Sequence, residues 1–252
     1  KPPFLTSAAL AGTRHGFLGR EGGVSTGIFA SLNVGLGSCD DRDALAENRR
    51  RAVEAVAPGA TLVTLHQVHS AIAVPVTGVF ADDARPHADA LVTATPGLAL
   101  GILTADCVPI LFADTNAGVI GAAHSGWKGT LTGVAAATVA AMEALGADRA
   151  NIAAAVGPCI AQRSYEVDSG FRDRFLADDP EHDRFFIPGK PGHFQFDIEA
   201  MVASRLAAEG LRHIELLGQD TYAQPDRYFS FRRTTHAGEG DYGRQLSVIA
   251  LG

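Results

Sequence analysis

A chain of 252 residues with 46% hydrophobic and 19% charged residues can bury a substantial core, which excludes an intrinsically disordered protein. The formal net charge of -7, with no block of basic residues, gives no electrostatic reason to expect binding to nucleic acid or anionic lipid. No apolar run approaches the ~18 residues of a membrane span, so we expect a soluble protein that binds a small molecule, with no nucleic-acid or membrane partner.

The cysteines Cys39, Cys107 and Cys159 are an odd number in a long chain, and no signal-peptide pattern is seen at its start. Because disulfides are characteristic of oxidising compartments, we expect free thiols and a cytoplasmic location. We find no internal repeat, low-complexity stretch or linker, so residues 1–252 are predicted to form a single domain. We expect a monomer or a small homo-oligomer.

The segment His15–Asp41 is rich in glycine and small polar residues, which predicts turns and short strands. It lacks the GxxxxGK[ST] spacing of a P-loop, but its backbone amides could wrap a ligand, and Asn33 is our candidate there for substrate binding. The next segment, Asp41–Val56, has acidic residues early and basic residues late, and Pro58 follows it. This pattern predicts a helix.

The segment Thr61–Val74 is strand-like because it has β-branched residues and a rough alternation of apolar and polar positions. In such a strand His66 and His69 lie on opposite faces, so only one of them can point into a site. A second short strand is predicted at Asp89–Thr93.

The central stretch sets a thiol and an imidazole at the ends of apolar strands. The apolar run Leu98–Leu103 is followed by Cys107, and after the run Pro109–Ala113 a turn leads into a buried strand, Val119–Ala123, that ends at His124. A helix is expected to start soon after. Rigid strands that hold reactive groups beside a helix N-terminus are a plausible setting for a site.

The C-terminal half is predicted to alternate helices and strands. The helices are Thr130–Leu145, closed by Gly146, then Tyr165–Leu176 and Asp197–Ala208, and the strands are Asn151–Cys159, Ile214–Leu217 and Gln245–Leu251. Cys159 is interpreted as a structural thiol. The segment Tyr228–Arg233 could line a pocket, with an aromatic ring for a base and an arginine for an anion, or it could be an amphipathic edge segment.

Three side chains could meet at the strand ends: His69, Cys107 and His124, which are 38 and 17 residues apart. This is not a zinc-finger spacing. Three ligands from separate elements leave a fourth position for water or substrate, as catalytic zinc sites do. A Cys-His pair acting as nucleophile and base would use the same residues without a metal.

Several motifs lie in collinear order along nearly the whole chain. They are HGFLGREGGVSTGIFASLNVG, VHS, ADALVT, LTADCVPILFAD, AAHSGWKGT, GPCI, FSFRR and GRQLSVI. With these motifs the chain resembles the YfiH-like family, also called the polyphenol oxidoreductase laccase-domain family or peptidoglycan editing factor.

The resemblance implies an α/β (α+β) fold, a mixed β-sandwich flanked by helices and related to the catalytic domain of cytotoxic necrotizing factor toxins. The family's metal ligands carry over to His69 in VHS, Cys107 in ADC and His124 in AHSGW. The activities described for the family are phosphorolysis of adenosine, inosine and methylthioadenosine, deamination of adenosine, copper-dependent oxidation of phenols, and editing of peptidoglycan precursors.

Each nucleoside reaction needs more than the metal. Deamination would use a zinc ion that lowers the pKa of water to ~7 for attack on purine C6, and it needs a general acid/base. Asp106 is our candidate, although it would point to the other face if its strand continued. Phosphorolysis needs an anion site, for which Arg49, Lys128 and the amides after Gly129 are the candidates.

A blue-copper site also uses two histidines and a cysteine, but one mononuclear site is poorly suited to a laccase reaction. We therefore predict a metal-dependent enzyme, with Zn²⁺ as cofactor and Cu²⁺ as the alternative, that acts on purine nucleosides and phosphate. His69, Cys107 and His124 are its predicted catalytic and metal-binding residues. The second hypothesis is a metal-free Cys107/His124 amidohydrolase, and the third is a non-enzymatic metal-binding accessory protein.

Overall fold

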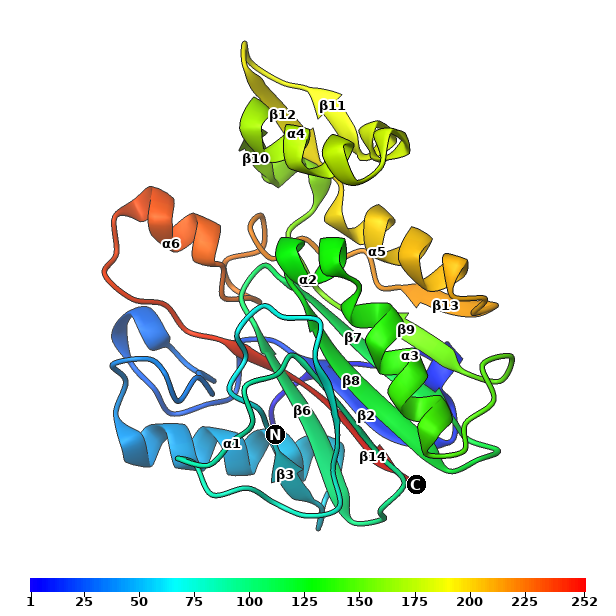
Figure 1. The fold of residues 1–252 in the computed structure, drawn as a ribbon. Coiled ribbons are helices and arrows are strands. Elements are labelled where there is room, and N and C mark those ends of the chain that lie inside the picture. The colour runs from blue at the N-terminus through cyan, green and yellow to red at the C-terminus, as the bar shows by residue number, and fades with distance from the viewer.

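The computed structural model describes residues 1–252, whose strands form three sheets (Figure 1). The five-stranded sheet contains, in spatial order, β1 (Phe4–Leu5), β2 (Thr13–Leu18), β14 (Gln245–Leu251), β6 (Leu98–Thr104) and β3 (Thr61–Val63). The six-stranded sheet contains β13 (His213–Leu216), β9 (Ala153–Val156), β7 (Val108–Asp114), β8 (Val119–Ser125), β5 (Ala90–Thr93) and β4 (Ala73–Pro75). The third sheet contains β10 (Glu166–Asp168), β12 (His193–Phe196) and β11 (Phe186–Pro188).

The α-helices are α1 (Arg42–Val56), α2 (Trp127–Thr132), α3 (Val134–Ala144), α4 (Ser169–Asp178), α5 (Ile198–Ala208) and α6 (Phe231–Ala237). The chain also contains four short 3-10 helices: η1 (Ala8–Leu10), η2 (Gly27–Phe29), η3 (Gln162–Ser164) and η4 (Pro180–Phe185). The predicted starts of two helices are confirmed by their caps. The side chains of Asp41 and Asp197 accept hydrogen bonds from backbone amides in the first turns of α1 and α5.

The two large sheets pack face to face, and helices cover their outer faces (Figure 1). The cluster between the sheets draws side chains from both of them, among them Phe17, Leu100, Leu111 and Ile120. A second cluster joins the five-stranded sheet to α1, and a third joins the six-stranded sheet to α3, α4 and α5. The predicted mixed α/β sandwich flanked by helices is confirmed.

Strand β6 shows why its apolar run has no polar face. Leu100 and Ile102 pack between the sheets, whereas Ala99 and Leu103 pack towards α1. This alternation has the period of two that a strand imposes, and here both of its faces are buried. The neighbouring strands β7 and β8 are buried along their whole length as well. Cys107, between β6 and β7, and His124, near the end of β8, are therefore held by strands that are rigidly packed.

The prediction of one strand over Thr61–Val74 is wrong. The chain forms β3, leaves the five-stranded sheet at Val63, and joins the six-stranded sheet only at β4. Between the two strands His69 has a positive φ of 62°, which no strand allows. The argument from alternating faces therefore does not apply to His69, because it lies in a loop that crosses from one sheet to the other.

Two predicted helices differ in detail. The helix predicted at Thr130–Leu145 is broken at Gly133, which has a φ of 95° and separates α2 from α3. Gly146 has a φ of 100° and ends α3, as predicted. The helix predicted at Tyr165–Leu176 begins only at Ser169, because the residues before it form the short strand β10.

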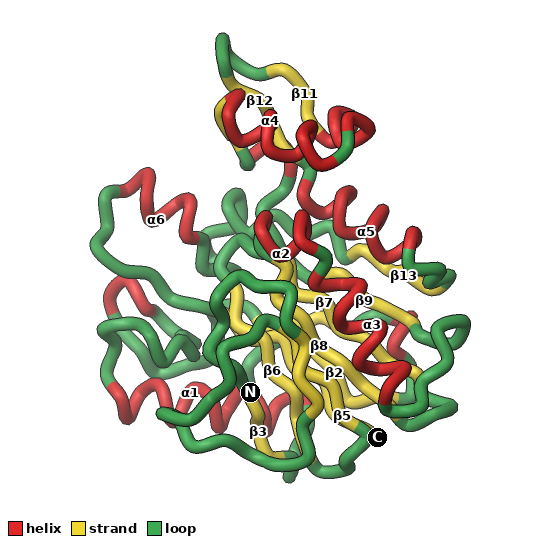
Figure 2. Tube along the Cα trace, viewed as in Figure 1, coloured by secondary structure: helices red, strands yellow, loops and turns green.

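The three-stranded sheet and α4 form a lobe that stands out from the two-sheet body (Figure 2). Its core is continuous with that of the body, because Phe175 and Phe196 belong to the same cluster as Val108 and Ile110 of β7. Trp127 of α2 contacts Phe171 of the lobe, with ring centroids 5.2 Å apart. The lobe and the body thus meet beside the strand end that carries His124.

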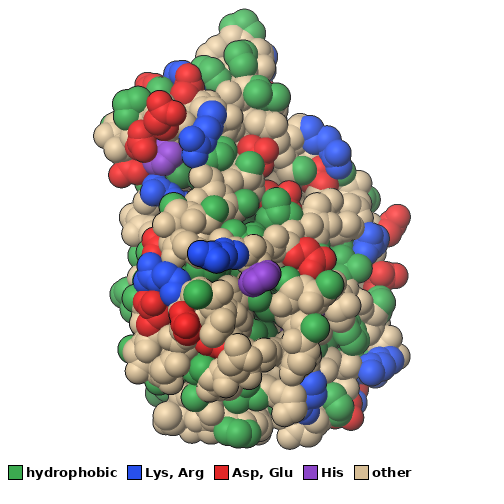
Figure 3. Space-filling view, turned by 90° about the vertical axis from the view of Figure 1, so that its right-hand side faces the viewer, with side chains coloured by type: hydrophobic (Ala, Val, Ile, Leu, Met, Phe, Trp, Pro, Cys, Tyr) green, Lys and Arg blue, Asp and Glu red, His purple; other side chains and the backbone are tan.

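The charged surface agrees with the composition. On the face shown in Figure 3, basic and acidic side chains are interspersed and form no extended block of one sign. None of the helices is long and apolar enough to cross a membrane.

Candidate functional site

The structure brings His69, Cys107 and His124 together. Their ligating atoms lie within 4.8 Å of one another, and no other group of three or more such side chains is found. The Sγ atom of Cys107 is 3.9 Å from Nε2 of His69, and the two imidazole centroids are 4.7 Å apart. We call these three residues the triad. Their meeting is what the sequence analysis expected, whereas their roles in binding and catalysis stay proposals.

Asp89 organises two members of the triad, and the sequence analysis assigned it no role. Its fully buried carboxylate accepts a hydrogen bond from Nδ1 of His124 at 2.8 Å. It also accepts hydrogen bonds from the backbone amides of Val68, His69 and Ser70. One carboxylate therefore holds the loop at His69 and orients the ring of His124, which leaves Nε2 of His124 free to face Cys107. A lone acidic residue before an apolar strand was its only sequence signal.

Cys107 and His124 shift each other's pKa. Burial by itself would raise the pKa of the Cys107 thiol, but the positive charge of His124 and the contact with His69 outweigh burial and lower it to about 6. Burial disfavours a charged His124, but the thiolate and Asp89 outweigh it and raise its pKa to about 9. The structure therefore favours a thiolate beside an imidazolium, and a metal ion would replace the proton on that imidazole.

The residues of the triad fit a metal ion. Two imidazoles and a thiolate form a donor set typical of zinc and copper, and the Asp89 carboxylate behind His124 is the usual outer partner of a metal-bound histidine. Gly126 leaves the necessary space, because a Cβ atom there would lie 2.8 Å from the His69 ring and 3.1 Å from Cys107 Sγ.

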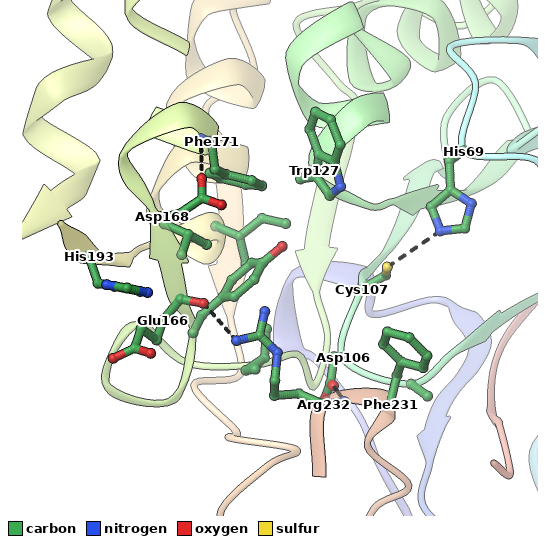
Figure 4. Close-up of a pocket in the computed structure, with 15 residues that line it drawn as sticks. His69, Asp106, Cys107, Trp127, Glu166, Asp168, Phe171, His193, Phe231 and Arg232 are labelled. Carbon is green, nitrogen blue, oxygen red and sulfur yellow. Dashed lines mark hydrogen bonds between the residues drawn. The ribbon is translucent and has the colours of Figure 1, made fainter. Parts of the chain in front are cut away.

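The first of two cavities beside the triad has a volume of about 500 Å³ (Figure 4). We call it the aromatic cavity. In Figure 4, Trp127 from α2 and Phe171 from α4 stand on one side, Phe231 lies near Cys107, and Arg232 lies below. The cavity is lined by His69, Ala105, Asp106, Cys107, Trp127, Ile160, Tyr165, Glu166, Val167, Asp168, Phe171, His193, Ile198, Phe231 and Arg232. The segment Tyr228–Arg233 thus supplies two pocket residues.

The second cavity has a volume of about 420 Å³ and shares only His69, Ala105 and Cys107 with the aromatic cavity. We call it the basic cavity. Its other wall residues are Gly35, Leu36, Gly37, Leu65, His66, Gln67, Arg85, Leu103, Thr104, His124, Tyr242 and Arg244. The two cavities therefore extend from the triad in different directions.

Asp106 does not continue a strand. Its φ is 85°, and its carboxylate accepts hydrogen bonds from Thr221 Oγ1 at 2.6 Å, Ser230 Oγ at 2.9 Å and the Arg232 amide at 2.7 Å. With three donors on one buried carboxylate, Asp106 anchors the segment that carries Phe231 and Arg232. The structure places it at the wall of the aromatic cavity, where it supports neighbouring residues.

None of the three substrate-binding candidates is among the residues that line the two cavities. Asn33 is fully buried, and Arg49 donates hydrogen bonds to the Val34 carbonyl and to Thr64 Oγ1. Lys128 is exposed and lies over the ring of its neighbour Trp127, 5.5 Å from the centroid. Their role in substrate binding stays a prediction; the polar groups of Asn33 and Arg49 are bonded within the protein, and Lys128 faces outwards. The basic residues that do line cavities, Arg85, Arg232 and Arg244, have no distinguishing local pattern.

All three cysteines are free, as expected. Cys39 is exposed, and Cys159 is 1% exposed, which agrees with the structural role predicted for it. Burial raises the pKa of Cys159 well above its ordinary range. Cys107 and Cys159 therefore differ, because the surroundings favour the thiolate at Cys107 and the neutral thiol at Cys159.

Residues 14–252 match a family described as "Multi-copper polyphenol oxidoreductase laccase". Two curated relatives are named purine nucleoside phosphorylase. One, from Pseudomonas aeruginosa, is 39% identical over 87% of each chain, and one, from Deinococcus radiodurans, is 39% identical over 99% of this chain and 93% of its own. Among solved structures, YlmD from Geobacillus stearothermophilus is 34% identical with a TM-score of 0.88, over 100% of this chain and 99% of that one.

Proposed function

The chain belongs to the family described as multi-copper polyphenol oxidoreductase laccase, and on that premise we propose that it is a metal-dependent purine nucleoside phosphorylase. The proposed reaction converts adenosine, inosine or methylthioadenosine and inorganic phosphate into the free base and ribose 1-phosphate or methylthioribose 1-phosphate. The names of the curated relatives support this choice. A multi-copper oxidation is less well supported, because the chain gathers a single group of three ligating side chains.

The observation that carries the proposal is that two residues of the triad, His69 and Cys107, line the aromatic cavity. Its volume of about 500 Å³ lies within the range of small-molecule sites. Trp127, Tyr165 and Phe171 offer ring faces or edges to a planar base, and stacking on such rings contributes about 1–3 kcal/mol per base. A purine placed there would bring its ribose close to Cys107 and His69, where the two cavities meet.

His69, Cys107 and His124 would hold the metal ion, with Asp89 orienting His124. A bound divalent ion supplies Lewis-acid chemistry, which stabilises negative charge as it develops. In the proposed reaction a phosphate oxygen forms a bond to ribose C1′, and the bond from C1′ to the purine nitrogen breaks. The electron pair of that bond goes to the purine, which takes up a proton. The protein's share is to orient the two substrates and to exclude water.

The same site offers two further reactions. Deamination of adenosine is a second proposed activity, because it uses the same metal donor set and the same purine position. A metal-free amidohydrolase is the alternative, and the chain Cys107–His124–Asp89 favours it, since a thiol, an imidazole and an orienting carboxylate form a nucleophilic triad. Asp89 serves both hypotheses, because a carboxylate also orients metal-bound histidines.

Product analysis tests the proposal directly. Purified protein of known metal content is incubated with adenosine, inosine or methylthioadenosine, with and without phosphate, and the products are separated by chromatography. We expect free base and the sugar 1-phosphate only when phosphate is present. Base release without phosphate would indicate a hydrolase, and inosine formed from adenosine would report deamination. If no base is released under any condition, the phosphorylase proposal is wrong.

Elemental analysis tests the metal. We expect about one zinc ion per chain in the wild type and a loss of metal in His69→Ala, Cys107→Ala and His124→Ala, because each removes one of three ligands. His213→Ala, which changes an exposed histidine of β13, is the matched control. Full metal content in all three triad variants would show that the site is wrongly assigned.

A further inference from the structure

The wall of the basic cavity contains two arginines, Arg85 and Arg244, and no carboxylate. Arg85 donates hydrogen bonds to the carbonyl oxygens of Asp82 and Leu65, and Arg244 lies over the Tyr242 ring at 4.1 Å. Neither guanidinium forms an ion pair with a carboxylate, unlike Arg50, Arg51, Arg149, Arg163, Arg172 and Arg205. Two guanidinium groups without a carboxylate partner favour an anionic ligand.

Two residues of the cavity wall each have a buried polar atom without a hydrogen-bond partner. Nη1 of Arg244 makes no hydrogen bond, and neither does Oγ1 of Thr104, a residue that is only 2% exposed. Because leaving a buried donor or acceptor unpaired is costly, such atoms commonly mark a place where a ligand completes the hydrogen bonds. An oxyanion can accept from both the guanidinium and the hydroxyl.

The two cavities differ in charge. The aromatic cavity has three carboxylates in its wall, from Asp106, Glu166 and Asp168, against one arginine, Arg232, so its wall disfavours a phosphate dianion. The basic cavity has no carboxylate. If one cavity receives the purine and the other receives phosphate, charge assigns phosphate to the basic cavity.

We propose that the basic cavity is the site of inorganic phosphate, held by Arg85 and Arg244 beside the triad. This inference rests on the proposed phosphorolysis. There, a phosphate oxygen approaches C1′ from the side opposite the purine, forms the new bond to carbon, and the departing purine takes the electron pair and then a proton. Two cavities that share only His69, Ala105 and Cys107 suit this geometry, with the ribose between them.

Asn33 acquires a defined role in this arrangement. Its side-chain oxygen accepts hydrogen bonds from the amides of Gly35 and Arg244, at 3.0 Å and 2.9 Å, and so joins both edges of the cavity. A Cβ atom at Gly35 would lie 2.9 Å from Arg244 Nη1, so a side chain there would displace the end of the Arg244 side chain. Asn33 is therefore a positioning residue for the phosphate site.

Steady-state kinetics with both substrates varied tests the proposal. Arg85→Gln and Arg244→Gln should each raise KM for phosphate by about 10- to 100-fold, the loss expected for a charged hydrogen bond, while KM for the nucleoside changes less than about twofold. Gly35→Ala should act in the same direction by displacing Arg244. Arg212→Gln, which removes an exposed arginine outside both cavities, should change neither constant. An unchanged KM for phosphate in all three cavity variants would overturn the proposal.

A binding measurement separates this proposal from the proposed function. Inorganic phosphate alone is titrated by calorimetry into metal-loaded wild type, Arg85→Gln and Arg244→Gln, with metal content and thermal stability measured on the same samples. Phosphate binding that is weakened in both variants at equal metal content supports the site even if wild type cleaves no nucleoside. Wild type that binds no phosphate, or variants that bind it as tightly as wild type does, would overturn it.

Discussion

At the scale of single residues, the two leading hypotheses disagree about Cys107. As a metal ligand its thiolate is engaged, so alkylation by iodoacetamide should be slow in the metal-loaded protein and should accelerate when a chelator removes the ion. As a free nucleophile beside His124 it should react rapidly whether or not metal is present. We expect the first behaviour.

Peptide mass spectrometry measures the labelling of Cys107 while nucleoside turnover is followed in the same samples. The other cysteines are internal controls. Cys39 is exposed and should react in both states, whereas the buried Cys159 should react in neither. Full turnover in chelated protein, abolished by rapid labelling of Cys107, would contradict the metal mechanism and favour the amidohydrolase.

Asp89 is the second residue whose change is informative. Asp89→Asn keeps the shape of the side chain but replaces one acceptor oxygen by a donor that faces the amides of Val68 and Ser70 or the ring of His124. Loss of an outer partner of a metal-bound histidine commonly weakens metal binding by about 10- to 100-fold. We expect a weakening of that size in a competition assay against a chelator of known zinc affinity.

Asp114→Asn is the matched control for Asp89→Asn. Asp114 is also a buried aspartate, and its carboxylate accepts hydrogen bonds from the amides of Asn116, Ala117 and Asp148, away from the triad. It should lower stability without changing zinc affinity. Equal zinc affinity in Asp89→Asn and in wild type would show that Asp89 does not support the metal site.

At the scale of elements, the sequence predicted the strands with long apolar runs, but it did not predict the conformation of the loops at the site. The strands β6, β7 and β8 follow from continuous apolar segments, because both faces of each strand are buried. The loop at His69 was read as a strand because its conformation depends on Asp89, twenty positions along the chain. No local pattern records a hydrogen bond of that kind.

The basic cavity shows the same limit. Gly35, Arg85 and Arg244 come from three distant segments, and only their packing places them in one wall. Arg49 and Lys128 were chosen instead because they stand near recognisable motifs. The family resemblance implied the three residues of the triad, but none of the motifs on which it rests indicates an anion site. The three-stranded sheet of the lobe was not predicted, because strands of three or four residues show little periodicity in the sequence.

One contact between the two large sheets is predicted to be sensitive to acid. The amide of Ser7 donates to Nε2 of His15 in β2, and its hydroxyl donates to Glu215 in β13. Burial lowers the pKa of His15 below its ordinary value of 6.5, although Glu215 acts in the opposite direction. Since the folded state favours the neutral ring, this stabilisation is complete above pH 6.5 and is lost as the pH falls below it. Hydrogen bonds to Ser7 and to the amide of Ala9 lower the pKa of Glu215, so its contribution is lost only below about pH 4.5.

Denaturant unfolding at about pH 7.5 and about pH 5.5 measures this effect. His15→Gln keeps an acceptor but does not titrate, so the variant should lose less stability between the two pH values than wild type does, by about 1 kcal/mol, the worth of one hydrogen bond. His213→Gln, at an exposed position of β13, should behave as wild type. An equal pH dependence in wild type and His15→Gln would contradict the argument.

At the scale of the whole molecule, strand pairing joins the ends of the chain to its middle. β14 pairs with β2 and with β6, so the last strand lies between one of the first strands and a central one. The sheet cannot be completed until residues more than two hundred positions apart have met. This non-local pairing supports the proposal that residues 1–252 form a single cooperative domain.

Tryptophan fluorescence can test whether the lobe unfolds together with the body. Trp127 is the only tryptophan; it belongs to α2 of the body and contacts Phe171 of the lobe. Because the aromatic cluster of the lobe is continuous with the core of the body, we expect both to unfold together. The free energy of unfolding from tryptophan fluorescence and from far-ultraviolet circular dichroism should then agree, with coincident midpoints in guanidinium chloride.

A fluorescence midpoint at clearly lower denaturant would show that the lobe detaches first, and Phe171→Leu should then widen the gap between the two midpoints. Coincident midpoints in wild type and in Phe171→Leu would establish one cooperative unit, in which the wall of the aromatic cavity is as stable as the sheets that hold the triad.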